Sequence, residues 1–255
     1  MHPNSVERLR NTLTESSVLA VIPARFHSTR LPGKILADIA GHPMIEHVFR
    51  RTTTASLVHA AVVATDDERI ARAVESFGGA AIMTRADHVS GTDRIAEAVA
   101  QLPCRLVVNV QGDEPLIEPE TIDAAIAPML ADAALEMSTL CRPLAGDHER
   151  DARSVVKVVT DLAGRALYFS RTPMPGSAAH IGLYVYRRDV LLRLAALPPA
   201  PLETLESLEQ LRALSHGIGI RVVPTAHGSA GVDTPADLER VRQLLAPHEG
   251  APSVM

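Results

Sequence analysis

Three cationic side chains follow the first apolar run of the chain within a few residues of one another. The segment VIPARFHSTRLPGK (21–34) stops being apolar at Pro23 and then carries Arg25, Arg30 and Lys34, separated by small and polar residues. Arginine, lysine and loop amides together form a combination that binds phosphate. The segment is neither GxGxxG nor GxxxxGK[ST], so the two common nucleotide-binding fingerprints do not apply. A basic loop exposed to solvent could have the same sequence. The segment alone therefore does not distinguish a phosphate-binding site from a solvated loop.

Two aspartates stand at points where the chain passes from one expected element to the next. VVNVQGDEP (107–115) runs from an apolar stretch into Gln111 and Asp113, and GVDTP (231–235) places Asp233 shortly before a proline. Carboxylates at strand ends suit a Mg²⁺ ion that bridges to a substrate phosphate. Each also has an ordinary alternative, a turn in the first segment and a helix N-cap in the second. Taken with the basic segment, the two aspartates predict a metal and triphosphate site.

The elements that must position these residues alternate along the first half of the chain. Continuous apolar runs are typical of strands buried on both faces, and amphipathic helices separate them. This βαβα order predicts a doubly wound α/β sheet that binds ligands at the carboxyl ends of its strands. The expected strands are 18–24, 60–65, 80–83 and 105–110, and the expected helices include 44–54, 93–101 and 121–132.

The second half of the chain changes pattern. Residues 154–161 and 166–170 predict a hairpin, and the alternation in 182–187 predicts a further strand. We interpret 202–214 as one amphipathic helix, whose stripe consists of Leu202, Leu205, Leu208 and Leu211. The last expected elements are a strand at 220–225 and a helix at 235–245 that Thr234 caps.

Composition limits the class of protein. The chain has 255 residues, of which 46% are apolar, and a net charge of −5, so we expect a folded protein that does not bind nucleic acid through a basic surface. Two cysteines, no apolar run of membrane length and no signal peptide predict a cytoplasmic protein without a membrane partner. We expect a flexible N-terminal extension over 1–16, a single domain over 17–246 and a disordered tail over 247–255.

Nine segments, in order from about residue 18 to 245, resemble the CMP-Kdo synthetases, which are 3-deoxy-manno-octulosonate cytidylyltransferases. The strings TRADHxSGTDR and QGDEP are the most specific of them. The segments are IPARFHSTRLPGK, VATDDERIARAVESFGG, MTRADHVSGTDRIAEAV, VVNVQGDEP, VVKVV, ALYFSR, HIGLYVYR, LESLEQLR and GVDTPADLERV.

The resemblance implies a Rossmann-like nucleotidyltransferase fold of the glycosyltransferase-A-like kind, with a mixed, mostly parallel sheet and a smaller dimerisation subregion. It implies a cytidylyltransferase in which CTP and an acidic acceptor give a CMP ester and pyrophosphate. It also implies Mg²⁺ as cofactor and a homodimer.

The resemblance further implies roles for individual residues. The catalytic residues would be Arg25, Lys34, Asp113 and Asp233, the last two as Mg²⁺ ligands. CTP would contact Pro23, Ala24, Arg25, Arg30, Lys34, Arg85, Ser90, Gly91, Thr92 and Gln111. The acceptor would contact Gln111, Arg171, His180, Tyr184, Glu209 and Gln210. Three of these have ordinary alternatives: His180 as a structural hydrogen-bonding residue, Glu209 on a solvated helix face and Tyr184 in the core.

The chain departs from the family pattern between Arg171 and His180. Only TPMPGSAA separates these residues, where the family usually carries a longer insertion with an aromatic residue and an arginine, and Thr204 stands where His or Gln is common. A short lid of small residues would leave hydroxyl groups of an eight-carbon sugar acid unpaired. We therefore expect a smaller acceptor, a phosphonate such as phosphonoformate or a carboxylate, with 3-deoxy-manno-octulosonate (Kdo) as the alternative. A non-catalytic CTP-binding paralogue is a remote alternative, because the four catalytic residues are intact.

Overall fold

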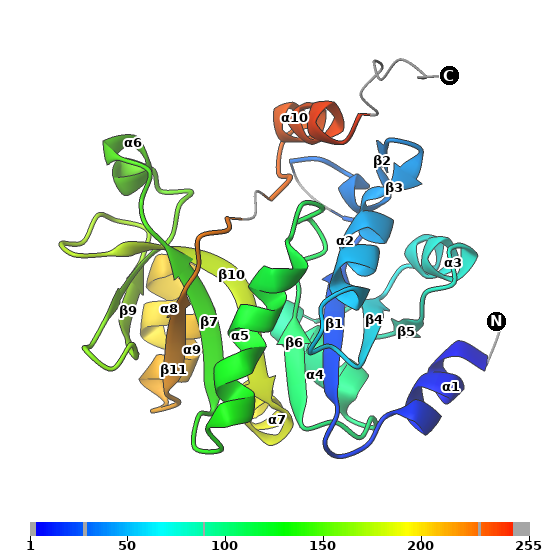
Figure 1. The fold of residues 1–255 in the computed structure, drawn as a ribbon, viewed down its shortest axis with the longest axis horizontal. Helices are drawn as coiled ribbons and strands as arrows, with labels where there is room; N and C mark the ends of the chain where they lie inside the picture. The colour runs from blue at the N-terminus through cyan, green and yellow to red at the C-terminus, as the bar shows by residue number, and fades with distance from the viewer. Residues whose placement is uncertain (1–3, 28–29, 89, 229–230, 247–255) are drawn as a thin grey trace, which may run out of the picture.

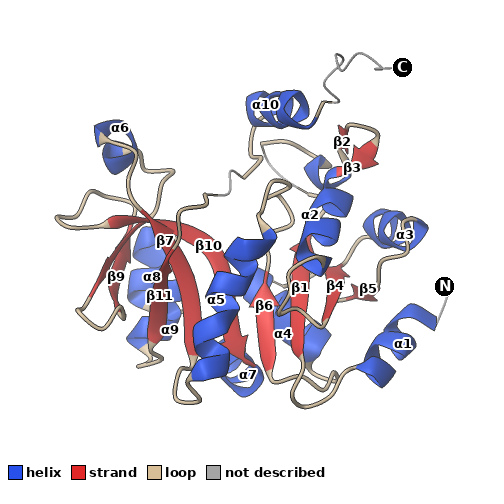
Figure 2. Cartoon of the chain, viewed as in Figure 1, coloured by secondary structure: helices blue, strands red, loops and turns tan. Residues whose placement is uncertain are grey.

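The computed structural model describes residues 4–27, 30–88, 90–228 and 231–246. Within them, nine strands form one mixed sheet in the order β11-β7-β10-β6-β1-β4-β5, with β8 beside β10 and β9 beside β8 (Figures 1 and 2). Its strands are β1 (Val18–Ala24), β4 (Ala60–Thr65), β5 (Ala81–Met83), β6 (Leu106–Asn109), β7 (Met137–Arg142), β8 (Lys157–Thr160), β9 (Ala166–Ser170), β10 (Ala178–Arg187) and β11 (Ile220–Pro224). A separate small pair is formed by β2 (Asp38–Ile39) and β3 (His42–Pro43).

Helices cover both faces of the sheet. In Figure 1, α5 lies in front of the strands and α4 behind them. The helices are α1 (Asn4–Thr12), α2 (Met44–Thr53), α3 (Glu68–Ser76), α4 (Gly91–Val99), α5 (Pro119–Ala131), α6 (Asp147–Asp151), α7 (Arg188–Ala196), α8 (Pro201–Glu206), α9 (Gln210–Ser215) and α10 (Pro235–Leu245), with a 3₁₀ turn η1 at Lys34–Leu36.

Strand β1 lies between β4 and β6 and is parallel to both. Its side chains alternate between two hydrophobic clusters: Val18 and Ile22 join the cluster that contains α2, α3 and α5, whereas Leu19 and Val21 join the cluster that contains α4 and α7. Because both faces are covered, nearly every position of the strand has to be apolar. The strands expected in the first half of the chain are confirmed, with ends that differ by at most one residue.

Strand β10 runs antiparallel to β6 on one side and to β7 on the other. The expected hairpin is confirmed as β8 and β9, and β8 pairs with the beginning of β10. Together with β11, these strands form the part of the sheet that surrounds α8 and α9 (Figure 1). The α/β fold class with a mixed sheet is therefore confirmed.

The prediction of one continuous helix at 202–214 is wrong. The chain forms α8 and α9, separated by Ser207, whose φ of 54° lies in the left-handed region. The break divides the expected leucine stripe: Leu205 is 77% exposed, whereas Leu208 and Leu211 are buried. Contacts at the end of α8 hold the break in place, because the Glu206 carboxylate accepts hydrogen bonds from the Ser170 hydroxyl and from a neighbouring backbone amide.

The expectation of a loose N-terminal extension is wrong for residues 4–12. They form α1, and the buried Leu9 and Leu13 add to the core. The amphipathic helix was not predicted because most residues around these leucines are polar. The expected tail at 247–255 lies outside the described residues.

The sequence analysis did not predict β7 or α7. Strand β7 reads MSTLCR, and its two hydroxyl-bearing residues are buried because each finds a backbone acceptor: Ser138 donates to Ala125 O and Thr139 to Leu183 O. None of the helices in the described part of the chain is long and apolar enough to cross a membrane.

Candidate active site

The carboxyl ends of β1 and β6 lie side by side, because Val21 pairs with Asn109 in parallel register. The basic segment after β1 and the QGDEP turn after β6 therefore leave the same edge of the sheet. Gly112 makes this approach feasible, since a Cβ atom there would lie 3.1 Å from Pro23 O and 3.3 Å from Ile35 Cδ1. Open α/β sheets bind their ligands at such an edge.

Lys34 joins the two predicted metal ligands. Its Nζ donates to Asp113 Oδ2 at 2.6 Å, to Asp233 Oδ1 at 3.0 Å and to Val232 O at 2.9 Å. Burial would lower the pKa of the Lys34 ammonium, but the charges and hydrogen bonds of the two aspartates outweigh it, and the pKa is raised. Arg30 makes a second ion pair with Asp233 Oδ1, also at 3.0 Å.

The structure decides the alternatives left open for the two aspartates. Residues 111–114 do form a turn, with Glu114 N donating to Gln111 O, and this turn presents Asp113 to the site. The N-cap of α10 is Thr234 rather than Asp233, because the Thr234 hydroxyl accepts the Asp237 amide hydrogen. Asp233 therefore does not cap α10, and its carboxylate pairs with Lys34 and Arg30.

Arg25, the first residue after β1, provides an anion-binding group. Its Nη2 atom is buried and has no hydrogen-bond partner among the described residues. The next residue, Phe26, is fixed from two sides: the Arg69 guanidinium lies 3.4 Å from its ring centroid, and a Cβ atom on Gly33 would lie 3.2 Å from the ring. A buried guanidinium nitrogen without a partner is costly, and a phosphate oxygen would satisfy it.

The N-terminus of α4 faces the same site. The Ser90 hydroxyl caps the helix by accepting the Asp93 amide hydrogen, and Gly91 lies near the Pro23 ring. Three residues into the helix, the buried Arg94 donates to Asp66 at 3.0 Å and to Thr84, which ties α4 to the ends of β4 and β5. The SGTDR string therefore both caps the helix and anchors it to the sheet.

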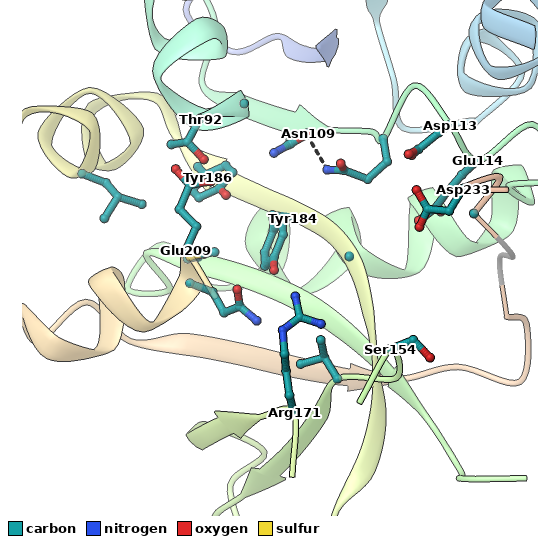
Figure 3. A pocket seen from close by; sticks show the side chains of 18 of the residues that line it. Thr92, Asn109, Asp113, Glu114, Ser154, Arg171, Tyr184, Tyr186, Glu209 and Asp233 are labelled. Carbon is teal, nitrogen blue, oxygen red and sulfur yellow. Dashed lines mark hydrogen bonds between the residues drawn. The ribbon is translucent and has the colours of Figure 1, made fainter. Parts of the chain in front are cut away.

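A cavity of about 470 Å³ extends from the aspartates along β10. Figure 3 shows Arg171, Tyr184 and Glu209 directed into it from different elements, with Asp113 and Asp233 at its other end. Its wall also includes Asn109, whose Oδ1 accepts a hydrogen bond from Gln111 Nε2 at 3.0 Å. Most of the labelled groups are polar, so the cavity suits a polar ligand.

Strand β10 supplies one wall of the cavity through an irregularity. Its register with β7 shifts between Ile181 and Tyr184, and the cavity is lined at this point by Gly182 and Tyr184. Tyr186, two residues on and on the same face, hydrogen bonds with Thr92 and Asn109. Burial raises the pKa of both tyrosines, which keeps their hydroxyl groups protonated as hydrogen-bond donors.

Arg171 reaches the cavity from the end of β9. Its guanidinium is oriented by backbone acceptors, with Nε donating to Glu206 O at 3.1 Å and Nη1 to Arg153 O at 3.2 Å. Among the described residues, the Arg171 guanidinium forms no ion pair with a carboxylate. An oriented guanidinium of this kind suits an acceptor carboxylate.

Glu209 and Gln210 line the cavity at the start of α9. Burial raises the pKa of the Glu209 carboxyl, and the Ser90 and Thr92 hydroxyls oppose this shift. Glu209 therefore does not lie on a solvated helix face, whereas Tyr184 both lines the cavity and packs against the core.

His180 lies next to the cavity wall rather than on it. Its Nε2 is 2.9 Å from the Thr139 hydroxyl oxygen, and its ring contacts Phe169 and Tyr184. Burial lowers the pKa of the imidazole to about 3, so it is neutral. These contacts match the structural alternative considered for this histidine.

Ten of the predicted site residues line the cavity directly. They are Arg30, Gly91, Thr92, Gln111, Asp113, Arg171, Tyr184, Glu209, Gln210 and Asp233. Lys34 contacts two of them, Asp113 and Asp233. The cavity lining does not include Pro23 and Ala24 of β1, Arg25 after it, or Ser90 at the α4 cap. Arg85 is separate: it lines another cavity, with Asp87 and Glu97 as its ion-pair partners.

The sequence analysis missed several wall residues. Asn109 and Tyr186 had usable signals: a polar Asn interrupts the buried run VVNV, and Tyr186 shares the strand face of Tyr184 by simple alternation. Met137, Ser154 and Val156 had none, because only the antiparallel placement of β10 brings them to the cavity.

The lid interpretation of the short segment after Arg171 is wrong. Ala178 and Ala179 are strand residues of β10 that pair with Val158 and Lys157, and Ala179 is buried. They do not line the cavity, and neither does Thr204, which is exposed on α8. The premise of unpaired hydroxyl groups under an Ala-Ala lid is therefore removed.

Comparison with known proteins decides the family. Residues 19–220 match the family model described as "Cytidylyltransferase". The chain is a cytidylyltransferase. As a member of this family it is a nucleotidyltransferase enzyme, and the alternative of a non-catalytic paralogue loses its support.

Similar proteins place this cytidylyltransferase in the CMP-Kdo synthetase family. The 3-deoxy-manno-octulosonate cytidylyltransferase of Geobacter sulfurreducens is 54% identical over 248 residues, which cover 90% of this chain and 99% of the relative. The enzyme of the same name from Solibacter usitatus is 51% identical over 237 residues, covering 89% and 94%. The resemblance of the nine sequence segments is thus confirmed.

Solved structures support the same family. A CMP:2-keto-3-deoxy-manno-octonic acid synthetase in complex with CTP superposes with a TM-score of 0.87 at 46% identity, covering 91% of this cytidylyltransferase and 99% of that chain. A cytidylyltransferase from Leptospira borgpetersenii, at 18% identity and a TM-score of 0.63 over 89% and 85% of the two chains, shares the fold.

Proposed function

We propose that this cytidylyltransferase transfers CMP from CTP to Kdo and releases pyrophosphate. The observation that carries the proposal is the continuity of one cavity, which joins the cations and carboxylates after β1 and β6 to the polar wall at Arg171, Tyr184 and Gln210. Relatives of the same name at more than 50% identity support Kdo as the acceptor. CMP-Kdo is the activated sugar that lipopolysaccharide synthesis uses, and we assign the chain to that process.

The CTP end of the cavity lies at the edge of β1 and β6. Arg25 and Arg30 supply positive charge there for the triphosphate, and the amides at the start of α4 face the same space. A solved relative that is 46% identical holds CTP, which supports CTP as the nucleotide. Cations beside the leaving group are the main requirement of this chemistry, because negative charge grows on the departing pyrophosphate.

Asp113 and Asp233 are a suitable donor pair for Mg²⁺. Their oxygens Oδ2 and Oδ1 converge on one cationic atom, Lys34 Nζ, at 2.6 and 3.0 Å, and carboxylate oxygens are the ligands that Mg²⁺ prefers. Bound there, the ion would neutralise charge on the phosphate oxygens. The two carboxylates lie at the end of the cavity nearest the basic segment, where the triphosphate is expected.

The acceptor end of the cavity has the groups that a polyhydroxylated acid requires. Arg171 can bind a carboxylate, and Gln111, Tyr184 and Gln210 can pair with hydroxyl groups. These side chains orient one acceptor hydroxyl toward the α-phosphorus. A bond forms from the acceptor oxygen to that phosphorus as the bond to the pyrophosphate oxygen breaks, and the hydroxyl proton passes to solvent. Correct placement of the reacting groups lowers the barrier of this step.

The comparisons favour Kdo over the small phosphonate that the sequence analysis preferred. The relatives from Geobacter sulfurreducens and Solibacter usitatus are both named for 3-deoxy-manno-octulosonate, and the segment after Arg171 does not line the cavity. The polar wall would leave several donors and acceptors unpaired around phosphonoformate, and unpaired buried groups reduce binding.

We also propose that the enzyme is a homodimer through the β8–β9 hairpin and α8. Four exposed leucines belong to these elements, namely Leu162, Leu167, Leu202 and Leu205, and the outer edge of β9 has no strand partner among the described residues beyond an isolated bridge. The molar mass in solution tests this proposal, because Leu167→Asp should shift it toward the monomer while leaving the fold intact.

Pyrophosphate release tests the reaction itself. The enzyme is assayed with CTP and Mg²⁺ against Kdo and phosphonoformate in parallel, and the nucleotide product is identified by mass spectrometry. We expect rapid release and CMP-Kdo with Kdo alone. Release with phosphonoformate and none with Kdo would overturn the proposed acceptor while leaving the cytidylyltransferase assignment intact.

A further inference from the structure

Lysine is rare in this chain and is placed at special positions. Of the 25 lysine and arginine residues, only Lys34 and Lys157 are lysines, and both are buried. Apart from histidines, all other basic side chains are arginines, including those on the surface. This preference for arginine suggests to us that each lysine stands where a guanidinium would not fit.

The geometry around Lys34 explains why an ammonium is needed there. All three of its N–H donors are used, by Asp113, Asp233 and the carbonyl of Val232. The residue is 9% exposed, and its three acceptors converge on one atom. A compact ammonium can occupy such a point, whereas the flat and wider guanidinium cannot. Lys34 Nζ thus bridges both carboxylates, whereas Arg30 pairs with Asp233.

The same two carboxylates are the proposed ligands of Mg²⁺. A divalent ion that uses Asp113 Oδ2 and Asp233 Oδ1 meets the ammonium at close range, and two positive centres there repel each other strongly. Once CTP is present, the triphosphate offers the side chain of Lys34 an alternative anion. Arg25 Nη2, which is buried without a hydrogen-bond partner among the described residues, supplies a phosphate-binding group on the segment that leads from β1 to Lys34. The two cations therefore compete for one pair of carboxylates.

We propose that Lys34 is a tethered cation that holds Asp113 and Asp233 together before the metal binds and is displaced by the metal toward the triphosphate. This inference rests on the proposed function, since it takes the metal and CTP from it. The displacement makes metal binding weak in the absence of CTP and strong in its presence, because the triphosphate accepts the ammonium that the metal releases. Lys34 is then the residue that couples the two ligands.

The scarcity of lysine allows a direct test on the unmodified protein. Mn²⁺ serves as the probe metal, and the accessibility of each lysine is measured by brief acetylation with acetic anhydride at fixed pH, followed by peptide mass spectrometry. Lys157 is the internal control, because its Nζ donates to Ala152 O and Arg171 O and forms no ion pair with a carboxylate in the described part of the chain. We expect saturating Mn²⁺ to raise acetylation of Lys34 several-fold while Lys157 stays unchanged, and CTP added with Mn²⁺ to lower it again. Unchanged acetylation of Lys34 at saturating Mn²⁺ would overturn the proposal.

A variant provides the second arm. Lys34→Met keeps an unbranched side chain, one atom shorter, and removes the ammonium that competes for both carboxylates. We expect it to bind Mn²⁺ without CTP at least about tenfold more tightly than the wild type, measured by calorimetry. The double variant Lys34→Met with Asp113→Asn should lose this gain, which assigns the ion to the carboxylate pair. Equal affinity of Lys34→Met and wild type would contradict competition. Neither arm requires turnover, so a failure of the proposed reaction is detected separately by pyrophosphate release.

Discussion

Tyr184 of β10 lies directly opposite Asn109 of β6 in the antiparallel register of the two strands. One residue belongs to the strand that ends in the QGDEP turn, and the other belongs to the wall of the proposed acceptor site. Because β10 runs in the opposite direction to β6, its beginning rather than its end lies at the nucleotide edge of the sheet. The reversed direction of β10 brings acceptor-binding groups next to the proposed CTP site.

The Asp113 carboxylate is expected to be essential for turnover. Asp113→Asn removes one charge of the pair that holds Lys34 and the proposed metal, and the loss of a group that stabilises transition-state charge costs about 10²–10³-fold in kcat. Steady-state pyrophosphate release measures this loss. Asp147→Asn is the matched control, since that side chain is 83% exposed on α6. Similar rates for both variants would remove Asp113 from the catalytic machinery.

Arg171 is expected to act on the acceptor and not on CTP. Arg171→Ala removes a guanidinium oriented by backbone carbonyls, and a lost hydrogen bond to a charged group costs about 1.5–3 kcal/mol, which is about 10–150-fold. We expect the KM for Kdo to rise by this factor while the KM for CTP changes little. Arg72→Ala on the exposed face of α3 is the control. An equal rise in both KM values would indicate a structural role.

Glu209 should make stability depend on pH. Burial raises the pKa of its carboxyl in the folded protein, so its favourable contribution is present below its ordinary pKa of about 4.3 and is lost as the pH rises through the raised value. Glu209→Gln removes this dependence. The variant should therefore melt at a higher temperature than the wild type at pH 8, with a smaller difference at pH 4. Thermal denaturation followed by circular dichroism at both pH values gives the comparison, and a difference of the opposite order would refute it.

Asp67 should stabilise the segment that supports Phe26. Its carboxylate caps α3 by accepting the Arg69 amide hydrogen and also pairs with the Arg69 guanidinium, which lies against the Phe26 ring. Hydrogen bonding from the Arg69 side chain lowers the pKa of Asp67 to about 2. We expect Asp67→Ala to cost about 1 kcal/mol, the usual value of an N-cap.

The pH dependence of that cost has a defined sign. The stabilisation by Asp67 is complete above the ordinary pKa of about 3.9 and disappears as the pH falls toward about 2. Urea denaturation of the wild type and Asp67→Ala at pH 7 and at pH 3 measures it. The two proteins should differ less at the lower pH, and a difference that grows on acidification would show that the carboxylate is not the source.

The sequence by itself determined the elements with strong local patterns and the chemistry of the nucleotide end. The run at 18–24 forms a buried strand because every residue in it suits burial. Thr234 before Pro235 specifies the start of a helix through contacts that reach only as far as Asp237. The residue types at Arg25, Lys34 and Asp113 were likewise readable, since each follows the expected end of a strand. These features depend on neighbours in sequence.

Tertiary structure decided how these residues meet. Lys34 lies 79 residues from Asp113 and 199 from Asp233, so no local pattern could place its ammonium between them. The break at Ser207 overrode a regular leucine stripe because Glu206 finds hydrogen-bond donors on β9. The segment 172–179 looked like a lid only until the pairing of β8 with β10 turned Ala178 and Ala179 into strand residues. Burial, charge neutralisation and strand pairing act between distant segments, and the acceptor wall is built from them.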